Sequence, residues 1–505
     1  MTAAHDTTGA SWGVDPGEAV SPLVIALDVG STACRGAVFD AYGRPVGRRV
    51  KISHSFTSAS DGTSEIDPDQ VVDELSTILD KLLREPGPTT GGMIGGVALD
   101  TFASSMVVVD AAGRALTSAM TYADSRPHDF VDALRAEVSE AELHQKVGTR
   151  IHTSYWPARL RWLQAEHPDL IAEAALYLSL GDYVLRALTG TIATGTASAA
   201  WTGMVDLATA DWSDEVIALA GISRANLPPI LHLDQPLEVA PEHRERLAER
   251  WPALADASWF AAISDGLAAN VGLGASDATT IGGTAATSGA LRVLVRELPA
   301  ELPGGLWCYR VSHDRSLVGG ALNDVGRAMS WATNALDAGD DLAGSLLVEP
   351  EGATPLVLPF FTGERSTGWA ANARAVLVGV DASSDGPAMA RGVVEGIAIS
   401  YRRILEQLRE LAPSARALHM GGSVTAELPS ALQVISDVLG LPVTPVTIKR
   451  STLLGTALLA LETVAPNAER IGPAHPEALT PASARAEYYE ERATRFESVY
   501  RALFA

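Results

Sequence analysis

The stretch VIALDVGSTACRGAVFD, Val24 to Asp40, decides the fold of the first half of the chain. An apolar run ends in Asp28, a Gly-Ser-Thr cluster follows at once, and a second apolar run begins. The pattern predicts two strands joined by a tight return, because Gly and Ser are common hairpin residues. A turn alone does not explain Asp28, since a buried carboxylate is costly unless it is paired or bound to a metal. We therefore expect a partner for Asp28 elsewhere in the chain.

Composition indicates a globular protein of two domains and argues against several classes of partner. The chain has 505 residues, which is too long for one hydrophobic core. Its 38 basic and 61 acidic residues give a net charge of -23, so neither nucleic acid nor an anionic membrane surface is an expected partner. No apolar run approaches the roughly 20 residues that a membrane span requires.

Cysteine usage and the first residues predict a cytoplasmic location. The two cysteines, Cys34 and Cys308, make neither a disulfide framework nor a zinc site. Residues 1–21 carry no basic start followed by an apolar core, so we expect a flexible tail there and no signal peptide.

The order of the expected elements predicts a mixed α/β architecture that is repeated in two halves. Three strands open the first half, and a helix follows in DPDQVVDELSTILDKLLRE, where Asp67 can cap and Pro68 suits the first helical position. The second half has the same rhythm, with a strand, a return and a strand in ATTIGGTAATSGALRVLV and a long amphipathic helix in GPAMARGVVEGIAISYRRILEQLREL. We predict a duplicated fold with a cleft between its halves, divided into the tail and domains over 22–275 and 276–505.

The usual phosphate and nucleophile motifs do not occur in the sequence. It has no GxxxxGK loop, no GxGxxG that opens a helix after a strand, no GxSxG and no HExxH. Acidic and glycine-rich strand ends remain, and backbone N–H groups in such returns can hold phosphate oxygens without a lysine. They are Asp28 to Thr32, Asp265-Gly266 in ISDGLAANVGLG, Thr287 to Gly289, Gly421-Gly422 before a helix, and PFFTGERSTGW.

These stretches resemble, in order, the motifs of the FGGY family of carbohydrate kinases, over about Leu23 to Leu461. ALDVGSTACRGAVFD resembles the first phosphate motif of the family, TYADSRP its W-x-D-x-R segment, and SDGLAANVGLG the segment that holds the catalytic Asp. TGERSTGW and GGSVTAELPSALQVISDVLGLPV are similar to the C-terminal signature and the adenosine-binding motif. The resemblance implies an actin-like, hexokinase-like ATPase fold of two duplicated ribonuclease H-like domains, and ATP-dependent phosphorylation of a sugar hydroxyl.

The resemblance also implies a role for each strand end. Asp265 would contact the sugar and act as general base toward its hydroxyl, with a helix cap as the alternative interpretation. Asp28 would orient Mg²⁺ or its waters, with a turn cap as the alternative. The residues implied in binding the phosphates and adenosine of ATP are Gly30, Ser31, Thr32, Thr287, Gly421 and Gly422.

The implied sugar site includes Ser104, in a loop that reads Phe-Ala-Ser-Ser where the family often has Met-His-Ser. Asp124 and Arg126 would meet the sugar, or form a buried structural pair. His152 and Arg159 are further candidates, and a core position is the alternative interpretation for His152. Basic residues in this region could hold a substrate carboxylate.

Other polar residues receive structural interpretations. Glu364 and Arg365 are expected to form an acid–base pair in a loop at the domain interface, and Trp369 is expected in the core. Gln433 and Asp437 are interpreted as solvated helix positions rather than ligands.

RIHTSYWPARLRWL, ATSGALRV and LWCYR are similar to the gluconokinase branch, so D-gluconate is the predicted acceptor and 6-phosphogluconate the product. Departures at Tyr122, usually Trp, and at Ala286, usually Gly, leave a kinase for xylulose, ribulose or another polyol as the second hypothesis. An actin- or chaperone-like ATP-binding switch is the third. The expected cofactors are ATP and Mg²⁺, the expected partners are the sugar or sugar acid and ATP, and self-association is expected to give a homodimer.

Overall fold

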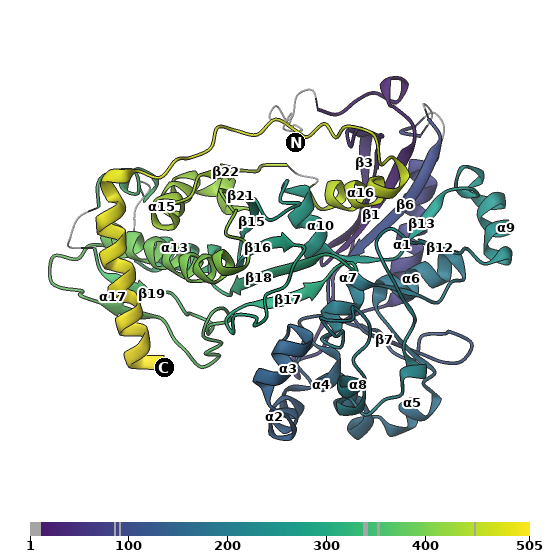
Figure 1. The fold of residues 1–505 in the computed structure, drawn as a ribbon, viewed down its shortest axis with the longest axis horizontal. Coiled ribbons are helices and arrows are strands. Elements are labelled where there is room, and N and C mark those ends of the chain that lie inside the picture. The colour runs from purple at the N-terminus through teal and green to yellow at the C-terminus, as the bar shows by residue number, and fades with distance from the viewer. Residues whose placement is uncertain are drawn as a thin grey trace. The chain divides into compact units, whose positions relative to one another are not determined.

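Two units make up this computed structural model, which describes residues 12–84, 87–89, 92–336, 342–350, 354–448 and 451–504. Unit 1 lies within Met1–Gly272, Cys308–Ser316 and Arg450–Pro473, and unit 2 within Leu273–Trp307, Leu317–Lys449 and Ala474–Ala505. Both units are mixed α/β, as the sequence predicts (Figure 1).

A seven-stranded sheet forms the centre of unit 1. Its strands, in spatial order, are β12 (Pro236–Leu237), β13 (Ser258–Phe260), β6 (Ile94–Thr101), β1 (Leu23–Gly30), β2 (Ala33–Phe39) and β3 (Pro45–Ser53), with β14 (Ile263–Ser264) beside β6. β1 and β2 are the antiparallel hairpin predicted from the opening stretch, and β3 extends it. β6 lies parallel to β1, and β14 lies parallel to β6.

Both faces of β1 are buried against helices. The odd-numbered side chains of Leu23–Val29 belong to the core that contains the apolar stripe of α1 (Pro68–Leu82). Val24 and Ala26 belong to a second core, which contains the apolar residues of α16 (Ser451–Val464). Because neither face meets water, the apolar run of β1 is continuous rather than alternating.

Helix α1 begins as the sequence predicts. The Asp67 side chain accepts a hydrogen bond from the Asp69 N–H at 2.9 Å, and Pro68 is the first helical residue. Of the apolar residues of α1, Val72 is half-buried, and Val71, Leu75, Ile78, Leu79 and Leu82 are buried. The cap and the stripe together fix where α1 starts and which side faces the sheet.

The remaining described elements of unit 1 are short. The strands are β4 (Thr57–Ser58), β5 (Ser64–Ile66), β7 (Val107–Val109), β8 (Ala119–Met120), β9 (Leu176–Leu178), β10 (Thr194–Gly195) and β11 (Ile230–Leu231). The helices are α2 (His128–Glu137), α3 (Glu140–Val147), α4 (Trp156–Glu166), α5 (Pro168–Glu173), α6 (Leu180–Thr189), α7 (Thr196–Ala199), α8 (Asp214–Leu219), α9 (Pro241–Arg250) and α10 (Asp265–Gly272).

Part of the predicted N-terminal tail is attached to unit 1. The Trp12 indole N–H donates to the Ile471 carbonyl at 2.8 Å, and the Val14 N–H donates to the Pro45 carbonyl at 2.9 Å. A short 3-10 helix follows at Pro16–Glu18. Residues 12–18 are therefore held by the unit, and the first eleven residues of the predicted tail lie outside the described residues.

The sheet of unit 2 repeats the topology of the sheet of unit 1. Its strand order within the unit is β18 (Ser316–Leu322), β16 (Gly289–Val295), β15 (Thr280–Ala285), β21 (Ala417–Gly421) and β22 (Val443–Pro445). Of β17 (Trp307–Arg310), Cys308–Arg310 belong to unit 1. β15 is antiparallel to β16 and parallel to β21, just as β1 is antiparallel to β2 and parallel to β6. The duplicated architecture predicted from the sequence is confirmed at this level.

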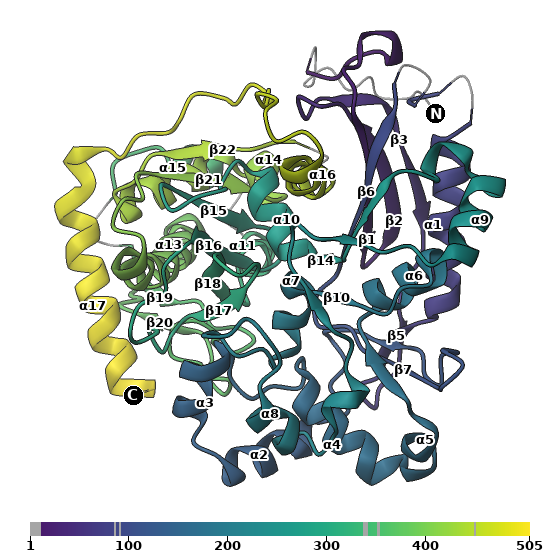
Figure 2. The same ribbon diagram turned by 45° about the vertical axis from the view of Figure 1, so that its right-hand side comes forward.

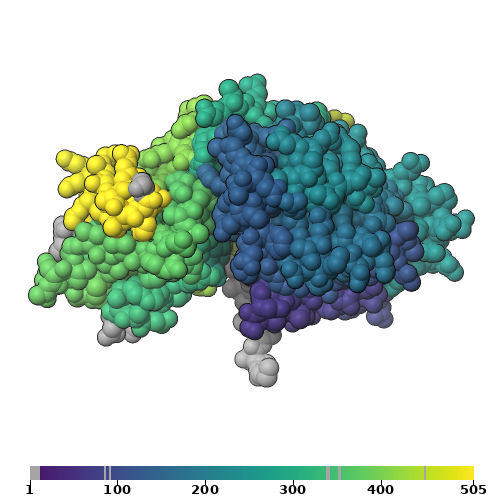
Figure 3. Space-filling model, turned by 90° about the horizontal axis from the view of Figure 1, so that it is seen from below, coloured from purple at the N-terminus to yellow at the C-terminus, as the bar shows by residue number. Residues whose placement is uncertain are grey.

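Unit 2 contains the long helices α13 (Gly386–Leu411) and α17 (Ala486–Phe504). α13 packs on the sheet through β16 and is buried over much of its length. α17, yellow in Figure 3, packs against α13, α15 (Pro429–Leu439) and β19 (Leu356–Leu358) and forms part of the surface. The other described elements are α11 (Gly326–Ala335), α12 (Leu342–Ser345), α14 (Val424–Glu427) and β20 (Val376–Val378). No helix in the described ranges of either unit is long and apolar enough to span a membrane.

Candidate active site

Three carboxylates of unit 1 lie at the carboxyl ends of neighbouring parallel strands. Asp28 of β1 is in register with Asp100 of β6, and Ile263 of β14 is also opposite Asp100. Asp265 follows β14 directly and is the first residue of α10 (Figure 2). Because parallel strands end at the same edge, the fold gathers Asp28, Asp100 and Asp265 there, and ligands of open α/β sheets bind at such edges.

Asp28 and Asp100 share a buried environment. Arg35 of β2 donates from Nη1 to Asp28 Oδ2 at 2.8 Å, and Thr456 of α16 donates from Oγ1 to Asp100 Oδ2 at 2.5 Å. Asp100 is fully buried, and its Oδ1 receives no hydrogen bond from the described residues. Arg35 is the partner that the sequence required for Asp28 without identifying it.

This environment raises the pKa of both carboxyl groups. Burial raises the pKa of Asp100 well above its ordinary value, and the charges of Asp28 and Asp265 raise it further. Burial also raises the pKa of Asp28, but the adjacent Arg35 guanidinium opposes that rise. The protonated form is therefore favoured more at Asp100 than at Asp28, because Arg35 stabilises the charged form of Asp28 alone.

The predicted phosphate turn follows β1. Gly30 is half-buried, and Ser31 and Thr32 are exposed between the paired residues Gly30 and Ala33. A Cβ on Gly30 would lie 2.8 Å from Arg35 Nη1. The absence of a side chain at Gly30 leaves room for the end of Arg35, which reaches Asp28.

Aromatic side chains surround the start of α10. A Cβ on Gly266 would lie 3.6 Å from Cζ2 of Trp201, so the indole borders this point. Trp201 stacks on Tyr309 with ring centroids 3.9 Å apart. Tyr122 is 46% exposed, and burial, followed by the charge of Asp265, raises its pKa. These rings offer apolar surface and a phenol next to Asp265, which suits a hydroxylated carbon chain.

Hydrogen bonds of both the side chain and the main chain hold Ser104 in place. Its hydroxyl donates to the Trp201 carbonyl at 2.7 Å, and its own carbonyl accepts from Arg159 Nη1. Its φ is 59°, an uncommon value for a residue other than glycine, and such strain gathers at functional sites. Arg159 also donates to the carbonyls of Thr153 and Thr121, so this buried guanidinium braces the loop. Burial lowers the pKa of Arg159 to about 10.

Asp124 and Arg126 form the expected pair. Arg126 Nε lies 3.0 Å from both oxygens of the buried Asp124, and Nη2 contacts Asp124 at 2.5 Å and Glu65 at 3.2 Å. The guanidinium also lies over the Trp162 ring, 4.8 Å from its centre. His152 is exposed, with Nδ1 at 3.1 Å from the Ser154 N–H, so the alternative of a core position is wrong for His152.

The predicted nucleotide residues of unit 2 lie at one edge of its sheet. Thr287 is in the exposed turn between β15 and β16, and its carbonyl accepts from the Val325 N–H at 3.1 Å. Gly421 ends β21 in register with Thr284 of β15. Gly422 has a φ of 111°, and a Cβ there would lie 2.1 Å from the Ala285 carbonyl oxygen. Only glycine allows this approach of the two strand ends.

Comparison with known proteins decides the family. Models of the FGGY family of carbohydrate kinases match residues 23–272 with the N-terminal domain and residues 281–463 with the C-terminal domain. This chain is an FGGY carbohydrate kinase. The third hypothesis, an actin- or chaperone-like switch, loses its support, because both matched models are kinase domains.

Relatives of this FGGY kinase differ in the substrate they are named for. A gluconokinase of Bacillus licheniformis is 23% identical over 459 residues, which cover 88% of each chain. A glycerol kinase of Mycolicibacterium vanbaalenii is 26% identical over 460 residues, covering 87% of this chain and 90% of the relative. A crystal structure of xylulose kinase from Rhodospirillum rubrum covers 95% of this chain and 99% of its own, with a TM-score of 0.87 and 22% identity. The last likeness establishes the fold alone.

Several sequence interpretations of this FGGY kinase need correction. Asp437 is buried, not solvated, and pairs with Arg485 at 3.1 Å. Gln433 donates to Asp437 at 2.8 Å and belongs to the same network. Glu364 has no described bond to Arg365.

Glu364 instead joins elements inside unit 2. It accepts from Arg403 Nη1 and from the Tyr500 hydroxyl, each at 2.5 Å, so its described partners lie within this unit and not at a domain interface. Trp369, expected in the core, is half-buried. Both residues serve the internal structure of unit 2.

Sequence reasoning missed Asp100 and Trp201. The signal for Asp100 was present, because IALD at 25–28 and VALD at 97–100 both end an apolar run in Leu-Asp. No local pattern indicates Trp201, whose proximity to Asp265 arises from tertiary packing.

Proposed function

We propose that this FGGY kinase transfers the γ-phosphoryl group of ATP to the terminal hydroxyl of D-gluconate, giving 6-phosphogluconate and ADP. The observation that carries the proposal is the position of Asp265. Asp265 is the first residue of α10 and lies at the same edge of the sheet as Asp28 and Asp100. It is half-buried beside Trp201 and Tyr122.

Asp265 is the general base of the proposed reaction. Its carboxylate accepts the proton of the terminal hydroxyl as that oxygen forms a bond to the γ-phosphorus. The bond between the γ-phosphorus and the β,γ-bridging oxygen breaks, and the electron pair leaves with ADP. A protonated residue could not accept this proton, so the proposed reaction requires Asp265 to be ionised.

Phosphate groups are proposed to bind at two hairpin turns. Gly30, Ser31 and Thr32 present backbone and hydroxyl donors in unit 1, and Thr287 lies in the corresponding turn of unit 2. Gly421 and Gly422 give the backbone that faces the adenosine. The two turns occupy equivalent places in the duplicated sheets, which supports a common role in holding the β- and γ-phosphates.

The donor set at the strand edge suits Mg²⁺. Arg35 stabilises the charged form of Asp28, and carboxylate oxygens are the protein ligands that Mg²⁺ prefers. When bound, Mg²⁺ neutralises charge on the phosphate oxygens. Asp28 would hold the ion or its waters, and Arg35 and Asp100 would orient the Asp28 carboxylate.

Ser104, Asp124, Arg126 and His152 are proposed to bind the acceptor. The described bonds of Arg126 use Nε and Nη2, which leaves Nη1 for a substrate oxygen. His152 is exposed and adds a second basic group in the same segment of the chain. The similarity to gluconokinases supports gluconate as the acceptor.

One observation favours a second candidate, a neutral polyol such as xylulose or ribulose. Arg159 donates to three carbonyls, and the charge of Arg126 is already balanced by Asp124 and Glu65. Arginines that already bind groups of the protein have fewer N–H donors left for a substrate carboxylate, so this arrangement favours a neutral acceptor.

A coupled ADP-release assay with gluconate, xylulose, ribulose and glycerol tests the acceptor. We expect kcat/KM for gluconate to exceed the others by about tenfold or more, a transition-state preference of about 1.4 kcal/mol. Arg126→Ala should raise KM for gluconate more than KM for xylulose. A tenfold preference for a neutral pentulose would refute gluconate, and an absence of any response to all acceptors would refute the kinase reaction.

A further inference from the structure

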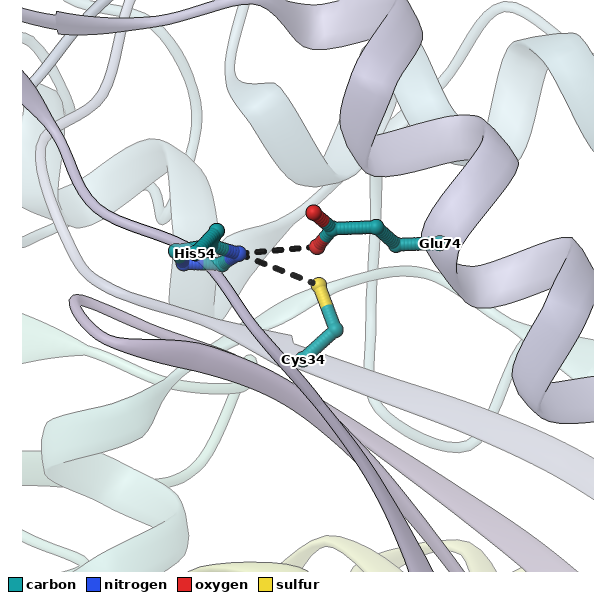
Figure 4. Close-up of side chains that lie close together, drawn as sticks. All are labelled: Cys34, His54 and Glu74. Atoms are coloured by element: carbon teal, nitrogen blue, oxygen red, sulfur yellow. Dashed lines mark hydrogen bonds and ion pairs between the residues drawn. The ribbon is translucent and has the colours of Figure 1, made fainter.

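A cluster of three side chains lies beneath the turn after β1. Cys34 comes from β2, His54 follows β3, and Glu74 comes from α1 (Figure 4). The His54 side chain has no exposed surface, and that of Glu74 is 10% exposed. None of the three takes part in the reaction proposed above, so their role requires a separate explanation.

His54 holds both ends of the turn Gly30–Thr32. Its main-chain N–H donates to the Thr32 carbonyl at 3.1 Å, and its ring Nε2 donates to the Gly30 carbonyl at 2.8 Å. The C=O and N–H of a trans peptide point in opposite directions. Because the Gly30 carbonyl is fixed on the imidazole, the Ser31 N–H of the same peptide is directed to the other side.

Glu74 fixes the imidazole in turn. His54 Nδ1 lies 2.8 Å from Glu74 Oε2, so a proton lies between them, and Gln70 donates to Glu74 Oε1 at 2.8 Å. Gln70 and Glu74 are one turn apart in α1, whose apolar stripe is anchored in the core. The turn is thereby connected through one ring to a rigid helix.

We propose that His54, oriented by Glu74, is a positioning residue that holds the Gly30–Thr32 turn in the form that receives the phosphates of ATP. The proposal rests on the proposed phosphate role of this turn. His54 reaches no substrate. It acts by setting the direction of backbone N–H groups before ATP arrives, which lowers the ordering cost of binding.

A metal site is the competing explanation for Cys34, His54 and Glu74. Two ligands bound to tetrahedral zinc at about 2.0–2.1 Å are roughly 3.3 Å apart, whereas Nδ1 and Oε2 are at the hydrogen-bond distance of 2.8 Å. Burial and the neighbouring Glu74 raise the pKa of the Cys34 thiol, which keeps it protonated. Cys34 Sγ lies 3.9 Å from Nδ1 and packs beside the ion pair as a neutral thiol.

The test compares His54→Ala with His144→Ala, a matched change at a histidine of α3 that is 2% exposed. Hydrogen exchange is measured on nucleotide-free protein, and ADP affinity is measured by calorimetry. In His54→Ala we expect amides of residues 29–34 to exchange about tenfold faster or more, and the Kd for ADP to rise about tenfold. KM for the acceptor should stay within about twofold. His144→Ala should leave the exchange of residues 29–34 and the Kd unchanged.

A second variant covers the case in which His54→Ala does not fold. Glu74→Gln keeps the size of the side chain and removes the charge, and it should shift exchange and ADP affinity in the same direction by a smaller factor. Unchanged exchange at residues 29–34 in both variants overturns the proposal, as does stoichiometric zinc in the wild-type protein that Cys34→Ser removes. The exchange measurement needs no substrate, so failure of the kinase assignment would be seen separately, in the ADP-release assay.

Discussion

Replacing Asp100 with Asn tests the electrostatics of the strand edge. The unfolded carboxyl has an ordinary pKa of 3.8 and releases its proton above that pH, whereas burial and the charge of Asp28 raise the pKa of folded Asp100 well above that value. The folded state therefore binds more protons, and the free energy of unfolding of the wild type falls as pH rises. The introduced Asn does not titrate, so this contribution to the pH dependence of stability is absent from the variant. The Asn amide can still accept a hydrogen bond from Thr456 and donate one to Asp28.

The expected difference follows from the linkage relation. From about pH 4 upward, the stability of Asp100→Asn relative to the wild type should grow by up to about 1.4 kcal/mol per pH unit, for as long as folded Asp100 remains protonated. Denaturant unfolding in EDTA at several pH values between 4 and 7 measures it. ADP release at pH 7 should stay within a few-fold of the wild type, since Asn imitates a protonated Asp.

A matched control is Asp182→Asn, at a buried cap of α6 far along the chain. Burial raises the pKa of Asp182 to about 6, so the relative stability of this variant should grow between pH 4 and 6 and then level off. A difference between Asp100→Asn and the wild type that does not change with pH, or that falls as pH rises, would show that folded Asp100 is ionised and would refute the reasoning.

Two further substitutions test single contacts. In Gly30→Ala the new Cβ would lie 2.8 Å from Arg35 Nη1, so the end of the Arg35 side chain must shift and we expect its bond to Asp28 to weaken. KM for ATP with Mg²⁺ should then rise by up to about tenfold in initial-rate measurements, and an unchanged KM would contradict this role of Gly30. Glu364→Gln removes the charge from a buried pair with Arg403, which keeps a second carboxylate partner, and should lower the free energy of unfolding by about 3 kcal/mol in a denaturant titration. A decrease in the free energy of unfolding of less than about 0.5 kcal/mol would mean that the pair contributes no more than an exposed surface ion pair, and would contradict the prediction.

Local patterns predicted the elements of the fold well. The amphipathic run Gly386–Leu411 is α13 with the same bounds, and the helix expected after the cap Asp67 is α1, which begins at Pro68. The hairpins after Asp28 and around Thr287 also follow from the sequence, because small residues between two apolar runs leave few other conformations.

Contacts between distant segments could not be predicted in the same way. Asp28 and Asp100 meet because β1 and β6 are in register, and Thr456 reaches Asp100 from 356 positions away. The sequence interpretation of Asp437 as solvated is wrong, because Arg485, 48 positions away, pairs with it in the interior. These pairings depend on tertiary packing, and the local hydrophobic pattern of the sequence does not contain that information.

The central claim is that Asp265 is the base of an acceptor-dependent kinase, and Asp265→Asn tests it most directly. ADP release with gluconate and ATP binding by calorimetry are measured on the same preparation. General base catalysis contributes typically ~10²–10⁴-fold, so kcat should fall by that factor while the Kd for ATP stays within about twofold. Turnover close to that of the wild type in Asp265→Asn would contradict the claim.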